Sequence, residues 1–312
     1  MTSHAERVIV IAGPTGVGKT HVALELARRL GGELIGADSV QVYRGFDIGS
    51  AKPTRAELGD TVHHLIDIAE PEEDLDAARY AELASAAIQD VSARGRVPIV
   101  VGGTGLWLRA LLRGLVEAPP VDRELRAELE RTWDELGPLA MHARLAQVDA
   151  RSAARIHAND KLRVVRALEV HAQTGKALGE LRDEHALGAA RYADLSVVLD
   201  LPRAPYTDRI RDRTRQMFAR GFPEEVAGLL HKHGPNVRAM QAVGYRQMAE
   251  ELTHGTAREV TLEQTVKATC VYARRQRTWW KSDPNVQLRL TAEQALAPEA
   301  MARYEAHLAA HS

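Results

Sequence analysis

The sequence predicts an α/β fold built on a mostly parallel β-sheet. Short runs rich in β-branched residues alternate with segments of helical periodicity, and the first of these runs ends at a glycine-rich turn. Continuous apolar runs are typical of strands that are covered on both faces, and strands that alternate with helices run parallel. A chain of 312 residues is long enough for one large domain with an insertion, or for two domains.

Apolar runs and helical periodicity place the individual elements. Residues 7–12 form a β-branched run that stops at glycine and proline, as a buried parallel strand does, and residues 19–30 carry apolar side chains on one helical face. The expected strands are residues 7–12, 33–37, 97–101 and 195–201. The expected helices outside the middle of the chain are residues 19–30, 77–94, 206–220, 224–233, 245–252 and 262–280.

The middle of the chain changes character at Pro119-Pro120. From there to about Tyr192 the sequence is rich in alanine, arginine and glutamate with helical spacing, and it contains no convincing strand. We therefore expect a first part of the α/β core in residues 1–118 and a helical insertion in residues 119–194. Residues 195–312 are expected to complete the core and to form a basic helical C-terminal region.

Composition limits the class of protein. No apolar run approaches the roughly 20 residues that cross a bilayer, and the N-terminus lacks the pattern of a secretory signal. Cys270 is the only cysteine, which excludes an intramolecular disulfide and a cysteine-rich zinc finger. We expect a cytoplasmic protein with no membrane partner.

Charge is spread unevenly although the formal net charge is only -1. Residues 70–76 hold five acidic side chains and no basic one, whereas residues 267–281 hold five basic side chains and no acidic one. An average near zero can therefore hide a basic surface suited to nucleic acid.

A phosphate-binding loop lies between the first strand and the first helix. The segment matches G-x-x-x-x-G-K-[ST] with Gly13, Pro14, Thr15, Gly16, Val17, Gly18, Lys19 and Thr20. In such a P-loop, glycines let backbone N–H groups converge on phosphate oxygens at a helix N-terminus, lysine reaches the terminal phosphates, and the Thr hydroxyl ligates Mg²⁺. The loop predicts binding of a di- or triphosphate, ATP among them, without deciding which; the alternative is a chance glycine-rich turn.

Most P-loop proteins have a second strand that ends in an acidic residue, and this sequence lacks that residue at the expected place. Residues 97–101 run into Gly102-Gly103-Thr104 without a carboxylate, and the nearest strand-end acid is Asp38. An NTPase that positions a hydrolytic water would show a different pattern. The sequence therefore favours a transferase over a motor or a switch.

The chain resembles the tRNA dimethylallyltransferases, also called isopentenyltransferases, in segments spread over nearly its whole length. The matching segments are Gly13 to Thr20, Ala37-Asp-Ser-Val-Gln-Val-Tyr43, Asp47-Ile-Gly-Ser-Ala-Lys-Pro53, His63-His-Leu-Ile-Asp67, Val101-Gly-Gly-Thr-Gly-Leu-Trp107, Asn159-Asp160 with Arg163, Arg166 to Val170, Gln241-Ala-Val-Gly-Tyr-Arg246 and Tyr272-Ala-Arg-Arg-Gln-Arg-Thr-Trp279. Two features depart from the family: Cys270-Val271 replaces a polar or basic pair, and the zinc-finger extension of eukaryotic members is absent.

The resemblance implies a P-loop core with a helical insertion, dependence on Mg²⁺, and prenylation of an adenosine beside the anticodon in tRNAs that read codons starting with U. The implied partners are dimethylallyl pyrophosphate and the tRNA anticodon stem-loop, and we expect a monomer. The prenyl chain would occupy an apolar channel that excludes water, and the adenine must be splayed out of the anticodon loop to reach it.

Three residues are predicted to be catalytic. Asp38 follows an expected strand at its carboxyl end, where α/β folds place ligands, and its carboxylate can accept the proton that the amine loses; the alternatives are a turn cap or a ligand of Mg²⁺-bound water. The resemblance places the catalytic arginine at Arg213, which shares a helical stripe with Arg209 and Arg220. Thr104 offers a hydroxyl beside the reacting centre, or simply an N-cap.

The predicted tRNA contacts combine the resemblance with a basic and aromatic pattern near the C-terminus. They are Asp38, Ser39, Val40, Gln41, Leu162, Arg163, Arg166, Gln241, Gly244, Tyr245, Arg246, Arg274, Arg277 and Lys281. Trp279 is more typical of a core residue than of an RNA contact. His63-His64 is more typical of a structural pair than of metal ligands. Two other functions stay open from the residues alone: a P-loop kinase for a small metabolite, and an RNA-binding protein whose loop senses nucleotide.

Overall fold

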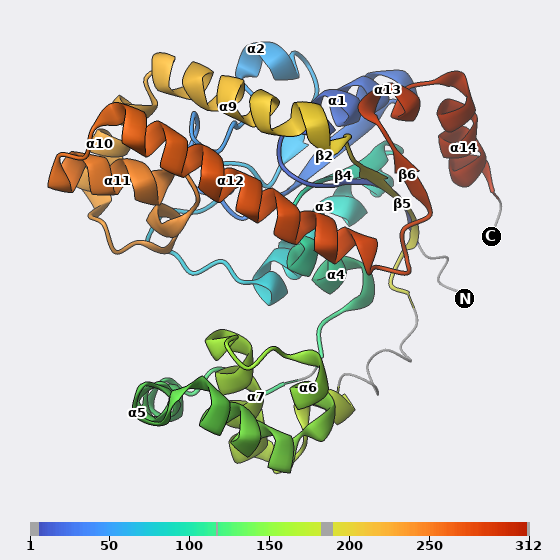
Figure 1. The fold of residues 1–312 in the computed structure, drawn as a ribbon. Coiled ribbons are helices and arrows are strands. Elements are labelled where there is room, and N and C mark those ends of the chain that lie inside the picture. The colour runs from blue at the N-terminus through green and yellow to red at the C-terminus, as the bar shows by residue number, and fades with distance from the viewer. Residues whose placement is uncertain (1–5, 117, 182–189, 311–312) are drawn as a thin grey trace. The chain divides into compact units, whose positions relative to one another are not determined.

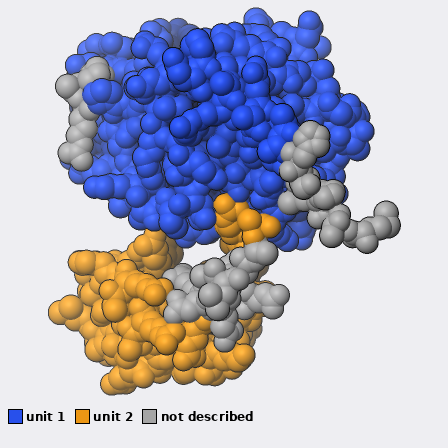
Figure 2. All heavy atoms as spheres, turned by 90° about the vertical axis from the view of Figure 1, so that its right-hand side faces the viewer, with its two compact units in different colours: residues 1–112, 191–312 blue, residues 113–190 orange. Residues whose placement is uncertain are grey.

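The computed structural model describes residues 6–116, 118–181 and 190–310. The chain forms two compact units, of which the first comprises Met1–Leu112 with Arg191–Ser312 and the second Arg113–Ala190 (Figure 2). The sequence placed the helical insertion at residues 119–194. Among the described residues, no helix is both long enough and apolar enough to span a membrane.

The first unit contains a six-stranded sheet in the order β3-β2-β4-β1-β5-β6, and every neighbouring pair is parallel (Figure 1). The strands are β1 (Arg7–Ala12), β2 (Gly32–Ala37), β3 (His63–His64), β4 (Val97–Gly102), β5 (Ala193–Leu199) and β6 (Leu288–Leu290). Four of these confirm the expected strands to within two residues at each end. The two edge strands β3 and β6 were not expected, because two or three residues carry no periodicity.

Alternate residues of the central strand face two separate hydrophobic clusters. Val8 and Val10 of β1 belong to one cluster, and Ile9 and Ile11 belong to the other; all four are almost fully buried. A strand covered on both faces must be apolar at every position, which explains the β-branched run from Val8 to Ile11.

Helices of the first unit pack on the two faces of this sheet. They are α1 (Lys19–Leu30), α2 (Arg55–Leu58), α3 (Ala77–Ala93), α4 (Gly105–Arg113), α9 (Arg203–Ala219), α10 (Phe222–His233), the 3-10 helix η1 (Arg238–Gln241), α11 (Tyr245–His254), α12 (Arg258–Lys281), α13 (Ala292–Ala295) and α14 (Pro298–Ala309). The helices α9 and α12, far apart in the sequence, lie side by side (Figure 1).

The second unit is helical in its described part. It contains α5 (Arg123–Val148), α6 (Ala150–Arg155) and α7 (Lys161–Thr174), which enclose a small core of their own. The long helix α5 is kinked at Gly137, where φ is 80°, directly before Pro138. Proline disfavours the helical conformation in the residue before it, so the kink follows from the sequence.

Candidate active site

A cavity of about 680 Å³ opens at the carboxyl ends of β1, β2 and β4. Each strand is followed at this edge by one of the predicted motifs: the P-loop, the segment that begins at Asp38, and the Gly102-Gly103-Thr104 turn. The cavity is lined by Thr15, Gly16, Gly18, Lys19, Thr20, His21, Asp38, Gln41, Ser50, Ala51, His63, Val101, Gly102, Asp208, Arg209, Asp212, Arg213 and Gln216. Five of the eight predicted phosphate-binding residues and two of the three predicted catalytic residues, Asp38 and Arg213, thus line one cavity, whereas Thr104 does not line it.

The P-loop owes its shape to glycines. Gly13 has φ of 141°, and a Cβ atom there would lie 2.3 Å from the carbonyl oxygen of Leu199. Gly16 and Gly18 have φ of 80° and 94°, a region that other residues rarely adopt. Among the described residues, no side chain caps the N-terminus of α1 after Gly18, which leaves the first N–H groups of the helix for an anion.

Lys19 is held in the cavity wall by its own loop. Its Nζ donates a hydrogen bond to the carbonyl oxygen of Pro14 at 2.8 Å. The pKa of Lys19 is lowered to about 8, mainly by burial; the charge of nearby Asp38 opposes this shift and that of Arg213 adds to it. A bound phosphate would place a negative charge next to this buried ammonium group and stabilise its protonated form.

Arg213 reaches the P-loop from α9. Its Nη1 donates to the Thr15 Oγ1 at 3.3 Å, and burial lowers the pKa of the guanidinium. Arg209 lines the same cavity, whereas Arg211 pairs with Glu263 at 3.1 Å on the exposed side of α9. Since arginine stays protonated at neutral pH, Arg209 and Arg213 present two cations to whatever occupies the cavity.

Asp38 follows the last residue of β2. Its Oδ1 accepts hydrogen bonds from the backbone N–H groups of Val40 at 2.9 Å and Gln41 at 3.3 Å. Its Oδ2 has no hydrogen-bond partner among the described residues, and Asp38 lines the cavity. One oxygen therefore fixes the carboxylate, and the other is free to accept a proton from a ligand.

Thr104 connects two of the motifs. Its N–H donates to the carbonyl oxygen of Ala37 at 3.2 Å, and its Oγ1 accepts from the N–H of Ser39, also at 3.2 Å. Its carbonyl oxygen accepts from Trp107 and Leu108 in the first turns of α4. The hydroxyl thus supports the backbone next to Asp38, and the predicted role at the reacting centre stays a prediction.

The sequence does not identify two residues that lie far from the P-loop along the chain and hydrogen-bond to its backbone. The Gln276 Oε1 accepts from the N–H of Thr15, and its Nε2 donates to the carbonyl oxygen of Gly103, both at 2.9 Å. The hydroxyl of Tyr206 donates to the carbonyl oxygen of Thr15. Gln276 lies inside the segment from Tyr272 to Trp279, which carries part of the family resemblance and the basic and aromatic pattern, but the sequence assigns Gln276 itself no role.

The charge of Asp38 also affects the pKa of Tyr272 in the same segment. Although Tyr272 is 37% exposed as a whole, desolvation of its phenol raises the pKa well above its ordinary value, and the negative charge of Asp38 raises it further. The phenol is therefore protonated at neutral pH and can donate a hydrogen bond near Asp38.

Comparison with known proteins identifies the family. The family model described as IPP transferase matches residues 41–283. This chain belongs to the IPP transferase family.

Relatives in the IPP transferase family match this chain over most of its length. The tRNA dimethylallyltransferase of Anaeromyxobacter dehalogenans (strain 2CP-C) is 48% identical over 301 residues, which cover 95% of this chain and 98% of the relative. That of Desulfosudis oleivorans is 45% identical over 281 residues, which cover 90% of each chain.

Solved structures of IPP transferases share the fold. The tRNA isopentenylpyrophosphate transferase of Bacillus halodurans is 34% identical with a TM-score of 0.69, and the match covers 97% of this chain and 95% of that one. A eukaryotic dimethylallyltransferase acting on tRNA is 29% identical with a TM-score of 0.78, covering 96% of this chain and 78% of that one. The predicted P-loop α/β fold and the resemblance to this family are confirmed.

Predicted tRNA contacts in the first unit lie at different depths. Gln41 lines the cavity, and Val40 packs partly buried against the core. Side chains of Arg246, Arg274 and Lys281 are exposed. The remaining positions are Ser39, whose N–H bonds to Thr104, exposed Gln241, whose amide donates to the carbonyl oxygen of Pro235, and Gly244, which precedes α11 with φ of 92°.

Two of the residues predicted to contact tRNA are held by contacts inside this unit. Tyr245 is 0% exposed, so its side chain supports the fold and is not available to tRNA. Arg277 donates to Asp200 Oδ1 and to the carbonyl oxygen of Leu201, both at 2.8 Å, and its guanidinium covers the ring of Tyr206. These contacts occupy Arg277 inside the first unit and stabilise the tyrosine that binds the P-loop.

In the second unit, the three predicted contacts also differ. Leu162 is 77% exposed, and Arg163 beside it is exposed near Asp160. Arg166, in contrast, pairs with the fully buried Glu169 at 3.0 Å and donates to the carbonyl oxygen of Pro119. Leu162 and Arg163 therefore remain the better candidates, and Arg166 is a structural residue of this unit.

Proposed function

We propose that this protein transfers a dimethylallyl group from dimethylallyl pyrophosphate to the exocyclic amine of the adenosine next to the anticodon in tRNA, and releases pyrophosphate. The observation that carries the proposal is the single cavity into which a P-loop and the carboxylate of Asp38 both project. Membership of the IPP transferase family supports it, since relatives are named tRNA dimethylallyltransferase. We expect tRNAs that read codons starting with U.

The reaction forms a bond between the amine nitrogen and the allylic carbon, and it breaks the bond from that carbon to the pyrophosphate oxygen. Pyrophosphate leaves with the electron pair, and the amine loses a proton. Because the adenine amine is a weak nucleophile, a fixed base that accepts this proton accelerates the step. The free Oδ2 of Asp38 is placed to be that base.

Negative charge grows on the pyrophosphate as it leaves, so cations aimed at it stabilise the transition state. Lys19, Arg209 and Arg213 supply positive charge from two sides of the cavity, and the N–H groups at the start of α1 add their dipoles. These groups act on the leaving group, whereas Asp38 acts on the nucleophile.

Mg²⁺ fits this donor set. Among the described residues, no group of three or more histidine, cysteine, aspartate or glutamate side chains could hold a metal. Mg²⁺ typically binds one or two protein oxygens together with substrate phosphates and water; the Thr20 hydroxyl provides such an oxygen in the cavity. The ion would neutralise charge on the pyrophosphate.

The test combines labelled donor with bulk tRNA. Incubation with dimethylallyl pyrophosphate labelled in the prenyl chain, Mg²⁺ and tRNA, followed by digestion to nucleosides, should give label on adenosine and one pyrophosphate for each group transferred. In a parallel incubation with ATP, consumption of ATP without transfer of label would instead indicate a kinase. Label on another nucleoside would contradict the proposed acceptor.

We further propose that the protein acts in the cytoplasm as a monomer. Light scattering of the purified protein, with and without tRNA, tests the second statement. A mass near the 34.3 kDa of one chain supports it, and twice that mass contradicts it.

A further inference from the structure

The loop of residues 38–53, which we name the Asp38 loop, carries four residues of the cavity wall. Asp38, Gln41, Ser50 and Ala51 all line the cavity. The loop is irregular between its turns, and Ala51 has φ of 52°, which is unusual for a residue with a side chain. Such a conformation persists only where surrounding contacts determine it.

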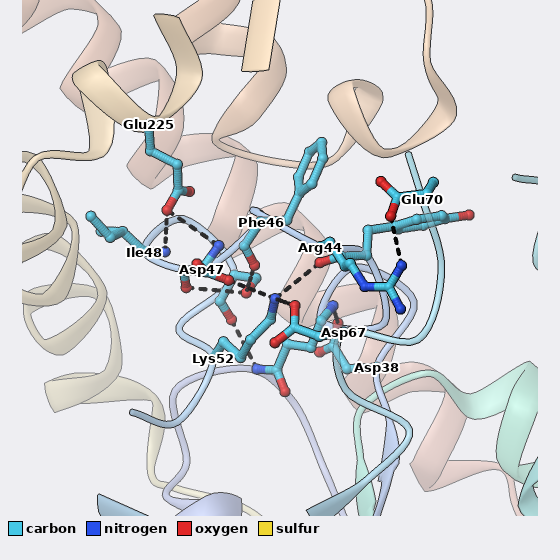
Figure 3. Close-up of polar contacts among 12 residues, drawn as sticks. Asp38, Arg44, Phe46, Asp47, Ile48, Lys52, Asp67, Glu70 and Glu225 are labelled. Carbon is cyan, nitrogen blue, oxygen red and sulfur yellow. Dashed lines mark hydrogen bonds and ion pairs between the residues drawn. The ribbon is translucent and has the colours of Figure 1, made fainter. Parts of the chain in front are cut away.

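Two side chains from distant helices bind four consecutive N–H groups of this loop; Figure 3 shows one of them, Glu225, beside Ile48. Glu225 of α10 accepts from Asp47 at 3.2 Å and Ile48 at 2.6 Å through Oε2, and from Gly49 at 3.2 Å through Oε1. The hydroxyl of Tyr245 in α11 accepts from Ser50 at 3.1 Å and donates to Glu225 Oε1 at 2.7 Å. Both side chains are thereby committed to the backbone of the Asp38 loop.

The loop also packs on these helices without space to move. A Cβ atom at Gly49 would lie 2.2 Å from the ring of Phe222 and 2.6 Å from that of Tyr245. The ring of Phe46 lies 4.7 Å from that of Tyr245, measured between centroids. Only glycine allows the backbone to come this close, so the hydrogen bonds and the packing define one position.

A third contact closes the base of the loop. The ammonium group of Lys52, whose side chain is 5% exposed, donates to the carbonyl oxygen of Tyr43 at 2.9 Å, to Asp47 Oδ1 at 2.6 Å and to Asp67 Oδ1 at 2.5 Å (Figure 3). Lys52 thus ties the loop to itself and to the segment after β3, but it does not reach the cavity.

Hydrogen bonds lead from this anchored turn to Asp38. The Nε2 of Gln41 donates to the carbonyl oxygens of Ser50 at 3.1 Å and Ala51 at 3.2 Å. The N–H of Gln41 donates in turn to Asp38 Oδ1. Gln41 thus links the carboxylate, which also accepts from the N–H of Val40, to the turn that Glu225 and Tyr245 hold.

We propose that Glu225 and Tyr245 are positioning residues for Asp38 and Gln41, and that they act through the N–H groups of residues 47–50. Neither side chain lines the cavity, so both act only through the loop. The inference rests on the proposed function, because Asp38 is the proposed base. It assigns Tyr245 a role at the active site that requires no contact with tRNA.

The test compares two pairs of matched substitutions. Y245F removes only the bridging hydroxyl and keeps the ring, and E225Q places an amide NH₂ group against N–H or O–H donors in either orientation. The controls are Y304F, which deletes a fully buried hydroxyl bonded to Ala295 at 3.2 Å, and E224Q, which changes an exposed neighbour of Glu225. Tm, kcat and KM are measured for each.

We expect Y245F and E225Q to lower kcat about tenfold or more, because misalignment of a positioned base by a fraction of an ångström is costly. The KM for dimethylallyl pyrophosphate should stay within about twofold, because neither residue touches the P-loop. The two controls should keep kcat within about twofold, and Y304F should lower Tm as much as Y245F. Wild-type kcat in folded Y245F and E225Q would overturn the proposal, as would equal losses in Y304F.

Amide hydrogen exchange separates this inference from the proposed function. Y245F and E225Q should speed exchange at residues 47–50 and also at 38–41. Faster exchange confined to residues 47–50 would show that Asp38 is held independently. If the wild type transfers no prenyl group but the two variants still speed exchange at both segments, the proposed function is contradicted and the coupling between the segments is not.

Discussion

The two loops that form the cavity are shaped in different ways. The P-loop takes its conformation mainly from its own residues, above all Gly13, Gly16 and Gly18 with positive φ, and distant Gln276 and Tyr206 add hydrogen bonds at Thr15. The Asp38 loop takes its conformation from Glu225 and Tyr245, which lie more than 170 residues further along the chain. The loop proposed to bind the leaving group is encoded mainly by local sequence, whereas the loop that carries the proposed base depends on contacts from distant helices.

Asparagine at position 38 should produce the largest effect. Asp38→Asn keeps the size and the hydrogen-bond acceptor for Val40 and Gln41 but cannot accept a proton. General base catalysis contributes about 100- to 10,000-fold, so we expect kcat to fall by that range while tRNA binding stays within about twofold. Wild-type turnover by Asp38→Asn in a single-turnover assay would remove the carboxylate from the mechanism.

A pair of arginines on α9 tests the charge on the leaving-group side. Arg213→Ala should lower kcat about 100-fold, the size of loss that follows removal of one group stabilising transition-state charge. Arg211→Ala is the matched control; because Arg211 pairs with Glu263 on the surface, its loss should change kcat less than about twofold. Equal losses in the two variants would show that the cavity does not distinguish the two arginines.

Gln276→Leu probes the one distant contact to the P-loop backbone that comes from α12. It removes the hydrogen bonds to Thr15 and Gly103, and buried groups left without partners cost about 1–3 kcal/mol each. We expect KM for the donor to rise about tenfold with a smaller change in kcat, the reverse of the pattern for Y245F. A fall in kcat alone would indicate that Gln276 acts on the Asp38 side instead.

His63 should affect stability more than turnover. Its two ring nitrogens are buried and have no partner among the described residues, and burial lowers its pKa to about 4 with a further contribution from His64. The unfolded chain binds a proton near the ordinary pKa of 6.5 and the folded protein does not, so the free energy of unfolding falls as pH decreases from about 6.5 to 4.

His63→Gln removes this titration. Thermal unfolding at several pH values in that window should show a shallower acid loss of stability in the variant than in the wild type. Identical slopes would mean that His63 is protonated in the folded protein. We expect kcat of His63→Gln near neutral pH to stay within a few-fold of wild type.

The comparison of loops also explains what the sequence could predict. The strand of residues 7–12, the P-loop and the first helix are contiguous, and their apolar period and glycine spacing identify them directly. The position of Asp38 follows from its place after a strand. Four strands and the main helices of the first unit were predicted for the same reason.

Residues that act across long sequence distances could not be predicted in this way. Gln276 and Glu225 are polar residues on helices without a motif of their own. Only the folded structure shows that they bind loops that lie far away in the sequence. Tyr245 was assigned to tRNA by the resemblance and Arg277 by the basic and aromatic pattern of its segment, yet one is buried and the other is paired internally. Resemblance identifies a segment as functional but does not separate contact residues from supporting ones.

The central claim is that the P-loop binds the pyrophosphate and that the Asp38 carboxylate faces the adenine amine. A crystal structure with Mg²⁺, a donor analogue that cannot react and an anticodon stem-loop tests it most directly. We predict the pyrophosphate within hydrogen-bond distance of the N–H groups of residues 16–20, and the exocyclic amine about 3 Å from the Asp38 carboxylate. A pyrophosphate bound elsewhere, or an Asp38 carboxylate turned away from the adenine, would contradict the account.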